Sequence, residues 1–337
     1  MKISEQWLRQ WVNPENTSEQ LAEQLTMVGL EIDDRYAVAR DFSGVVIGEV
    51  MSVEQHPDAD KLRVTQVNIG DAEPLQIVCG APNVTVGMKV PVATVGAVLP
   101  SEDKAGFKIK KSKLRGVASN GMLCGASEID LVDDIDGLLE LPNDAPIGIN
   151  IREYLGLDNQ ILDISITPNR GDCFSVRGIA REISVINDLP MQMPKIADSI
   201  GINDNSATPA VKVDAVEACP RYLVQSIDNI DRSIDTPKWM QDALVQSGLR
   251  SHNFLVDVTN YVLMELGQPL HAFDADTIVG DIVVRLAQPE ESVTLLNEQT
   301  ITLTGDELVI ADDKGVLALA GIMGGQRSSV TDSTKNI

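Results

Sequence analysis

The sequence contains few of the residue types that most often build metal and redox sites. Among 337 residues there are three histidines, four cysteines and 4% aromatic residues. The cysteines stand far apart, at positions 79, 124, 173 and 219, so no two have the close spacing of zinc ligands. We therefore expect buried thiols that stay reduced, as is typical of a reducing compartment.

Several common signatures are also missing. No apolar run reaches the ~18 residues that a membrane span needs, and the N-terminal MKISEQWLRQW lacks the apolar core of a signal peptide. The sequence contains no GxSxG, GxGxxG, P-loop or HExxH motif. These absences predict a cytoplasmic protein with no membrane segment. They give no sign of the enzyme classes that these nucleophile, nucleotide-binding and zinc motifs mark.

Positive charge is scarce as well. The formal net charge is −23 and the pI is near 4.4, while 43% of the residues are hydrophobic. The acidic balance disfavours unselective nucleic-acid binding over the whole surface but leaves room for a local basic patch. The hydrophobic content suffices for packed cores, and the length predicts two or three domains.

Helical signals come first along the chain. Ser4 is placed to cap one helix, and Thr17 with Gln20 three residues later has the pattern of a capping box for a second. Gly29 is placed to end that second helix in a left-handed conformation.

Between Gly44 and Leu141 the pattern changes to period two. Five short stretches are rich in β-branched residues and bounded by Gly, Pro, Asn or Asp, namely VVIGEVMSV, KLRVTQVNI, LQIVCG, KVPVATV and FKIKKSKL. This strand count and size predict an OB-type barrel, with a small sandwich as the alternative.

The chain then mixes helices and strands. A helix is expected after Ser175, a proline-rich linker from Pro190 to Pro209, and strands at 211–213 and 222–226. Further on, Thr236-Pro237 predicts an N-cap followed by proline at the first helical position.

A second helix should run from about Asn253 to Leu266 and stop at Gly267. After it come the strand-like stretches DIVVRLA, SVTLLN, TITLTG, ELVIAD and VLALAGIMGG. This succession predicts an α+β domain.

A cluster of cations stands out within the acidic chain. Its members are Lys104, Lys108, Lys110, Lys111, Lys113 and Arg115. Phe107 and Ile109 alternate with two of the lysines, so those lysines would share the outer face of a strand. Such a face can follow a phosphate backbone, but lysines also protect edge strands against aggregation, and the residues alone leave both interpretations open.

The motif HPDADKL is a weaker candidate. His56 beside Asp58 and Asp60 suggests a metal site, yet no second His or Cys lies nearby. A turn built by Pro and Asp is therefore the favoured interpretation.

The stretch VTNYVLMELGQPLHAFD carries the third candidate. Thr259 and Asn260 are polar residues in a helical run, where they are not favoured, and His271 follows the predicted helix end. With the Gly324-Gly325 turn these residues could line a polar pocket, in which backbone amides stabilise an oxyanion and a histidine of pKa ~6.5 orients or deprotonates water. The alternative is that His271 and Asp274 only hold a loop in place.

Taken in order along the chain, these motifs resemble the bacterial phenylalanyl-tRNA synthetase β subunits. The matching stretches are WVNPENTSEQLAEQLTMVGLEID, HPDADKLRVTQVNIG, QIVCGAPNV, KLRGVASNGMLC, DISITPNRGDCFSVRGIAREIS, VDVTNYVLMELGQPLHAFD and ALAGIMGG. The barrel motifs also mark a wider group of tRNA-binding domains, whereas their combination with DVTNY and ELGQPLHAFD is highly specific.

The resemblance implies an α+β multidomain fold. Residues 1–38 with 151–190 would form a split N-terminal α/β domain, 39–150 an inserted OB-type tRNA-binding barrel, 191–209 a linker and 210–337 an editing module. The chain would be the N-terminal portion of a longer subunit.

The resemblance also implies an activity. The family's enzyme is an α2β2 heterotetramer that attaches phenylalanine to its tRNA, with ATP and Mg²⁺ used in the α subunit. This chain should therefore bind no cofactor of its own and should not aminoacylate by itself. It would contribute tRNA binding through the cation cluster, and hydrolysis of tyrosine wrongly esterified to the tRNA.

The family's editing residues correspond here to Thr259, Asn260, His271 and, of the glycine pair, Gly325. His271 would position the water and the terminal ribose, and Thr259 and Asn260 would hold the substrate. The glutamate that recognises the tyrosine hydroxyl should lie just past Ile337.

Two other functions compete with this one. The chain could be a non-catalytic tRNA-binding and subunit-assembly scaffold. It could also be a metallohydrolase that uses His56, His271 and nearby aspartates, and this hypothesis predicts that a chelator abolishes activity.

Overall fold

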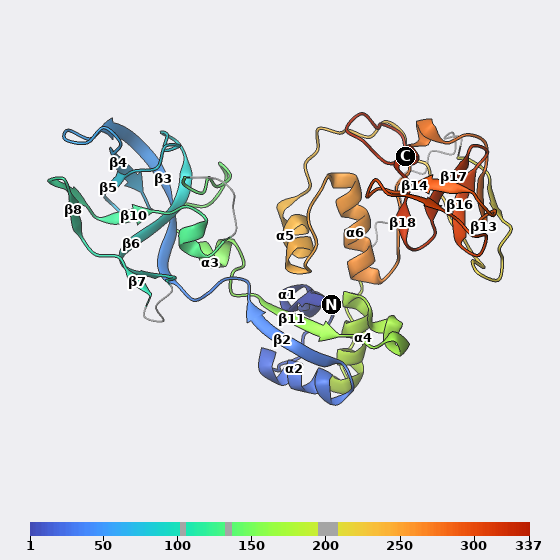
Figure 1. Ribbon diagram of the computed structural model, residues 1–337. Coiled ribbons are helices and arrows are strands. Elements are labelled where there is room, and N and C mark those ends of the chain that lie inside the picture. Colours follow the sequence, from blue (N-terminus) through green and yellow to red (C-terminus); the bar gives the residue numbers. More distant parts are fainter. Residues whose placement is uncertain (102–105, 132–136, 195–207) are drawn as a thin grey trace. The chain divides into compact units, whose positions relative to one another are not determined.

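A computed structural model describes residues 1–101, 106–131, 137–194 and 208–337. The chain divides into two compact units (Figure 1): residues 1–34 together with 162–337 form unit 1, and residues 35–161 form unit 2. The four-part division expected from the sequence stays a prediction, and most of the expected linker at 191–209 lies outside the described residues. Within the described ranges, no helix is long and apolar enough to cross a membrane.

The N-terminal part of unit 1 combines helices with a small sheet. Its elements are α1 (Glu5–Trp11), α2 (Ser18–Met27), η2 (Pro168–Cys173) and α4 (Val176–Asn187), with β1 (Lys2–Ser4), β2 (Glu31–Ala37) and β11 (Gln160–Ser165) in the order β1-β11-β2. Strands β2 and β11 carry the chain across the boundary between the two units.

The local helix signals are confirmed. The Ser4 hydroxyl accepts the Trp7 N–H at 3.2 Å at the start of α1. Both halves of the Thr17–Gln20 capping box form at the start of α2, and Gly29 follows that helix with a φ of 89°. These signals act within four residues, so they work before any tertiary contact forms.

The core of this part is built from residues of α1, α2, α4 and β11. Leu8, Leu21 and Ile179 are fully buried in one apolar cluster with Trp7. The Trp7 ring stacks on Tyr261 with centroids 4.6 Å apart, which joins α1 to the C-terminal helices of the same unit.

Unit 2 is mostly antiparallel sheet. Its strands are β3 (Ser43–Gln55), β4 (Arg63–Asn68), β5 (Leu75–Cys79), β6 (Lys89–Leu99), β7 (Phe107–Lys108), β8 (Ser112–Leu114), β9 (Val117–Ser119) and β10 (Gly121–Leu123), accompanied by η1 (Ser127–Ile129) and α3 (Ile151–Tyr154). The main sheet runs β10-β6-β3-β4-β5, β7 pairs with β6, and β8 pairs with β9.

The prediction of one strand over FKIKKSKL is wrong. Ile109 is buried and exchanges backbone hydrogen bonds with Gly96 and Ala97 next to β7. Beyond it the chain leaves β6, and Ser112–Leu114 pairs with Val117–Ser119 instead. The apolar–polar alternation continues along the segment, but the strand with which it pairs changes. A local sequence pattern does not reveal such a change of partner.

The C-terminal part of unit 1 contains two helices and two sheets. The elements are β12 (Val211–Val213), α5 (Lys238–Gln246), α6 (Phe254–Leu266), η3 (Ala275–Thr277), β13 (Ile282–Leu286), β14 (Ser292–Thr294), β15 (Thr300–Thr302), β16 (Leu308–Asp312), β17 (Gly315–Leu319), β18 (Met323–Gly324) and η4 (Gln326–Ser328). One sheet runs β12-β13-β16-β17-β18 and the other pairs β14 with β15. The expected α+β mixture is confirmed.

Three local expectations fail. Residues 222–226 form no strand, and it is Ile227, just after them, that exchanges backbone bonds with Ile337. Pro237, not Thr236, is the N-cap of α5, because the Thr236 hydroxyl donates to Asp257 of α6 instead. All four cysteines are free, but Cys219 is only half-buried, unlike the other three.

Candidate functional site

Helix α6 positions the first two predicted site residues. The Asn253 side chain accepts the Val256 N–H at 3.2 Å at its start, and Gly267, with a φ of 74°, ends it as predicted. The Thr259 hydroxyl donates to the Val256 carbonyl at 2.8 Å, so its hydrogen is used within the helix. Asn260 is half-buried, and its side-chain amide has no hydrogen bond to any described residue.

His271 lies after the helix, in contact with an aromatic ring and a glycine. Its imidazole meets Phe273 edge to face, with centroids 4.6 Å apart and an interplanar angle of 73°. The residue as a whole is exposed, but its ring packs against Phe273 and Gly324, and the resulting desolvation lowers the pKa of His271 below its usual 6.5. At pH 7 the imidazole is therefore mainly neutral and can accept a proton.

The two glycines of the predicted turn have different surroundings. A Cβ added to Gly324 would overlap the His271 ring, coming within 2.7 Å of Nε2. The Gly325 N–H donates to the Leu317 carbonyl at 2.7 Å, so this amide is engaged in the sheet. Gly324, not Gly325, is thus the glycine that lets the imidazole lie against the backbone.

Asp274 does not form a catalytic pair with His271. Its carboxylate accepts the Asp276 N–H at 3.1 Å and the Thr334 hydroxyl at 2.6 Å, and it caps η3. Asp274 therefore holds the loop, as one of the sequence alternatives stated, while the His271 ring is held by packing.

Asp257 is an organising residue that sequence analysis missed. It is fully buried, and its carboxylate accepts hydrogen bonds from the Thr236 hydroxyl at 2.6 Å, the Ser251 hydroxyl at 2.6 Å and the His252 N–H at 2.8 Å. These bonds connect the segments that precede α5 and α6 to the first turn of α6. A signal existed, since an aspartate stands between two valines in the apolar run FLVDV.

Unit 2 carries the cation cluster. Lys108, Lys110, Lys111, Lys113 and Arg115 are all exposed on β7, β8 and the adjoining turns, whereas Lys104 lies outside the described residues. Within the described ranges none of these five forms an ion pair. Their charge is therefore available to an anionic partner.

His56 supports residues 107–119, the segment that carries these cations and that is called the hairpin below because β8 and β9 pair within it. The residue is 2% exposed, its Nδ1 accepts the Asp58 N–H at 3.0 Å, and its Nε2 lies 3.0 Å from the Leu114 carbonyl. With Nδ1 as acceptor, Nε2 carries the proton and donates to Leu114. Both ring nitrogens are engaged, which contradicts a metal-binding role for His56.

Comparison with known proteins yields two family models. Residues 45–150 match the model described as a putative tRNA binding domain, and residues 218–337 match the B3/4 domain. The first covers the cation cluster of unit 2, and the second covers Thr259, Asn260, His271 and Gly325.

Whole sequences give a finer result. The chain is 87% identical over 337 residues to the phenylalanine–tRNA ligase β subunit of Psychrobacter arcticus and 63% identical over 338 residues to that of Acinetobacter baylyi; in both cases all of this chain and 42% of the relative are covered. The predicted family resemblance is confirmed. The chain thus spans less than half the length of these β subunits.

A solved structure of an N-terminal fragment of the phenylalanyl-tRNA synthetase β subunit from Pyrococcus horikoshii also matches. It is 17% identical, with 53% of this chain and 54% of that chain covered and a TM-score of 0.28. This likeness is too weak to support a structural argument.

Proposed function

We propose that this chain acts as the N-terminal part of a phenylalanine–tRNA ligase β subunit, where it binds tRNA and hydrolyses tyrosine mistakenly esterified to it. The observation that supports the hydrolytic role is the packing of the His271 imidazole against Gly324 within the B3/4 match, where desolvation lowers the pKa of the ring. Phe and Tyr differ by one hydroxyl, which an apolar synthetic pocket rejects incompletely. A second, hydrolytic site corrects that error.

The proposed reaction is ester hydrolysis. Water adds to the ester carbonyl, the bond from that carbon to the ribose oxygen breaks, and tyrosine and a free tRNA hydroxyl are released. Neutral His271 would orient the water and take up its proton before that proton reaches the ribose oxygen. Thr259 and Asn260 would hold the substrate, and the missing side chain at Gly324 leaves the room in which the His271 ring lies.

Binding of tRNA would use unit 2. The Asn120 N–H beside β10 donates to the Gln76 carbonyl in β5 at 2.9 Å, so the two end strands of the sheet approach each other, which supports the OB-type barrel. Exposed lysines on one side of it would contact phosphates, and the contact should be salt-sensitive because counterions are released.

Aminoacylation itself would belong to an α subunit, in a cytoplasmic α2β2 assembly that uses ATP and Mg²⁺ there. The described residues of this chain do not fit a Mg²⁺ site. Asp172, Cys173 and Glu182 come together, but Arg170 pairs with both carboxylates and Arg181 pairs with Asp172. The arginine guanidinium groups already neutralise the carboxylates that would have to bind the cation.

A scaffold without catalysis is the second candidate. It is favoured by the internal bonds of the Thr259 hydroxyl and the Gly325 amide, because groups engaged in the fold are not free for substrate.

The test is deacylation of Tyr-tRNA by the complete enzyme with wild-type and His271→Ala β subunits. Loss of a positioned acid–base group should slow hydrolysis by about 100-fold. His252→Ala is the matched control, since this exposed histidine contributes only its backbone N–H to the Asp257 network.

Each outcome decides between the hypotheses. Equal rates for the wild-type and His271→Ala enzymes would leave the scaffold as the better account. Loss of wild-type hydrolysis on chelation, with recovery on adding zinc, would show that hydrolysis depends on a metal bound without His56.

A further inference from the structure

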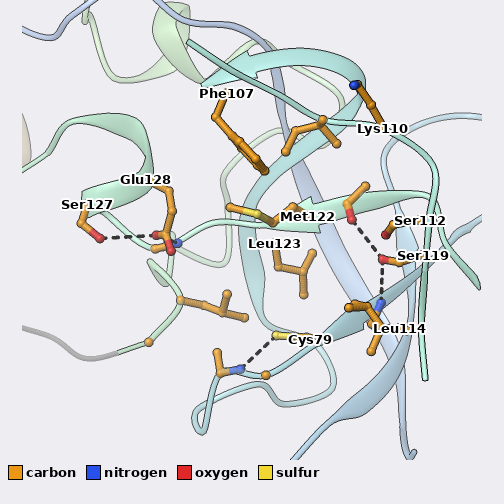
Figure 2. Close-up of a pocket in the computed structure, with 18 of the residues that line it drawn as sticks. Cys79, Phe107, Lys110, Ser112, Leu114, Ser119, Met122, Leu123, Ser127 and Glu128 are labelled. Carbon is orange, nitrogen blue, oxygen red and sulfur yellow. Dashed lines mark hydrogen bonds between the residues drawn. The ribbon is translucent and has the colours of Figure 1, made fainter. Parts of the chain in front are cut away.

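Unit 2 contains a cavity of about 850 Å³, to which the function proposed for the cation cluster assigns no ligand. It opens between the end of β5, the segment from β7 to β8, strand β10 and η1 (Figure 2). Its lining mixes apolar and polar side chains, among them Phe107, Lys110, Ser112, Met122, Ser127 and Glu128. The volume is of the size of small-molecule sites, which run from about 300 to 1,000 Å³.

An aromatic ring at the cavity is left exposed. Residues 35–161 contain four aromatic residues, Tyr36, Phe42, Phe107 and Tyr154. Phe107 is 56% exposed, compared with 36% for Tyr36 and 7% for Phe42. An exposed aromatic ring beside unpaired lysines is the arrangement with which proteins stack single-stranded bases while neutralising the adjoining phosphates.

A carboxylate lies at the cavity near the start of η1. Glu128 Oε2 accepts the Gly125 N–H at 2.8 Å and lies 3.5 Å from the Ser127 hydroxyl. Its Oε1 makes no hydrogen bond to any described residue. The bond from Gly125 orients the side chain, and its second carboxylate oxygen can accept a hydrogen bond from a ligand but cannot donate one.

We propose that this cavity binds one unpaired nucleobase of a bound RNA, stacked on Phe107 with its N–H edge toward Glu128. Guanine is the preferred base, because its Watson–Crick edge offers adjacent N–H donors to a carboxylate. Lys108 and Lys110 border the same cavity and would neutralise the phosphates on either side of the base. The proposal rests on the tRNA-binding function assigned to unit 2 above and names the part of the RNA that this site takes.

The test uses the 337-residue chain and two fluorescein-labelled single-stranded tetraribonucleotides, one with a central guanosine and one of uridine only. Phe107→Leu should weaken binding of the guanosine probe by about tenfold, since base stacking contributes ~1–3 kcal/mol, and Phe107→Tyr should restore it. Glu128→Gln should reduce the preference for guanosine over uridine. Met51→Ala, at a residue 54% exposed in the same unit, is the control that should change neither.

A second measurement locates the site. The methyl resonance of Met122, which lines the cavity, should shift when the guanosine probe is added, and its position without RNA shows that each variant is folded. An unshifted Met122 methyl with bound probe, wild-type affinity in Phe107→Leu, or no binding by the wild-type chain would each overturn the proposal.

The result also separates this proposal from the broader function. If Phe107→Leu has no effect but Lys108, Lys110 and Lys111 changed together to Glu weaken tRNA binding, the cavity proposal fails and tRNA binding by unit 2 stands. If neither variant weakens tRNA binding, both fail.

Discussion

The hairpin of unit 2 and the His271 region of unit 1 present their functional groups in opposite ways. The five described cations of the hairpin are exposed and have no ion-pair partner among the described residues. Among the residues assigned to the His271 region from the sequence, the Thr259 hydroxyl, the Gly325 amide and the Asp274 carboxylate all have internal partners. Charge acts over about 10 Å at ordinary salt, whereas hydrolysis needs atoms placed to within a fraction of an ångström.

The largest effect should come from removing the buried Asp257 carboxylate in the His271 region of unit 1. Asp257→Ala leaves three donors of Thr236, Ser251 and His252 unpaired, so unit 1 should lose on the order of 3 kcal/mol of unfolding free energy. Denaturant unfolding followed by tryptophan fluorescence reports this unit alone, because Trp7, Trp11 and Trp239 all lie in it.

Two controls bound that prediction. Asp281→Ala, at an exposed aspartate of the same unit, should leave the denaturant midpoint unchanged. In both variants the methyl resonance of Met122 should report unfolding of unit 2 at the same denaturant concentration as in the wild type. An equal loss in Asp257→Ala and Asp281→Ala would show that the Asp257 network contributes nothing.

The next effect tests placement of the imidazole. Gly324→Ala puts a Cβ where the His271 ring lies, and the displaced ring should slow deacylation of Tyr-tRNA by about 100-fold. Gly171→Ala is the control, since a Cβ there has no neighbour within 4 Å. Full activity in Gly324→Ala would mean that the His271–Gly324 contact is not part of the site.

A smaller effect is expected for the cations, since each contributes charge alone. Changing Lys108, Lys110 and Lys111 together to Glu should weaken tRNA binding by about tenfold and reduce the slope of log K against log salt by about 2. Lys61, Lys314 and Lys335, all exposed, give a control with the same change in net charge. Equal losses in the two triple variants would show that total charge, not this hairpin, governs binding, and no loss in either would leave edge protection as the role of the lysines.

The smallest effect concerns pH. In the proposed reaction His271 acts in its neutral form, and desolvation lowers its pKa below 6.5, so deacylation should fall as pH decreases through that lowered value. The rate at pH 6.5 should therefore still exceed half of its plateau at higher pH. An inflection above pH 7 in the rate profile would contradict the environment described for the ring.

Much of the local structure was predictable because its causes lie within a few residues. Ser4, Thr17 and Gly267 cap or end their helices as their neighbours dictate. Thr236 shows the limit of such rules, since its hydroxyl bonds to Asp257, which lies 21 residues away. A distant acceptor replaced the local one, and no local pattern contains that information.

The candidate site shows the same division. The stretch VTNYVLMELGQPLHAFD indicated the polar residues after a helix, and its place among the other motifs indicated the family. It did not show that Gly324 lies against the His271 ring, that Asp274 bonds to Thr334, or that His56 supports the lysine-bearing hairpin. Each of these contacts joins residues about 50 or more positions apart in the sequence.

The sequence by itself determined most helix boundaries, most strand positions, the clustering of positive charge and the family resemblance. These follow from residue type and short spacing, which act along the chain. Only the tertiary structure decided which groups are engaged and which are free: the Asp257 carboxylate accepts a hydrogen bond from Thr236, 21 residues away, while Phe107 and its neighbouring lysines line a cavity. The physical reason is that hydrogen-bond satisfaction and desolvation depend on what packs alongside a group, and chain folding brings those neighbours from afar.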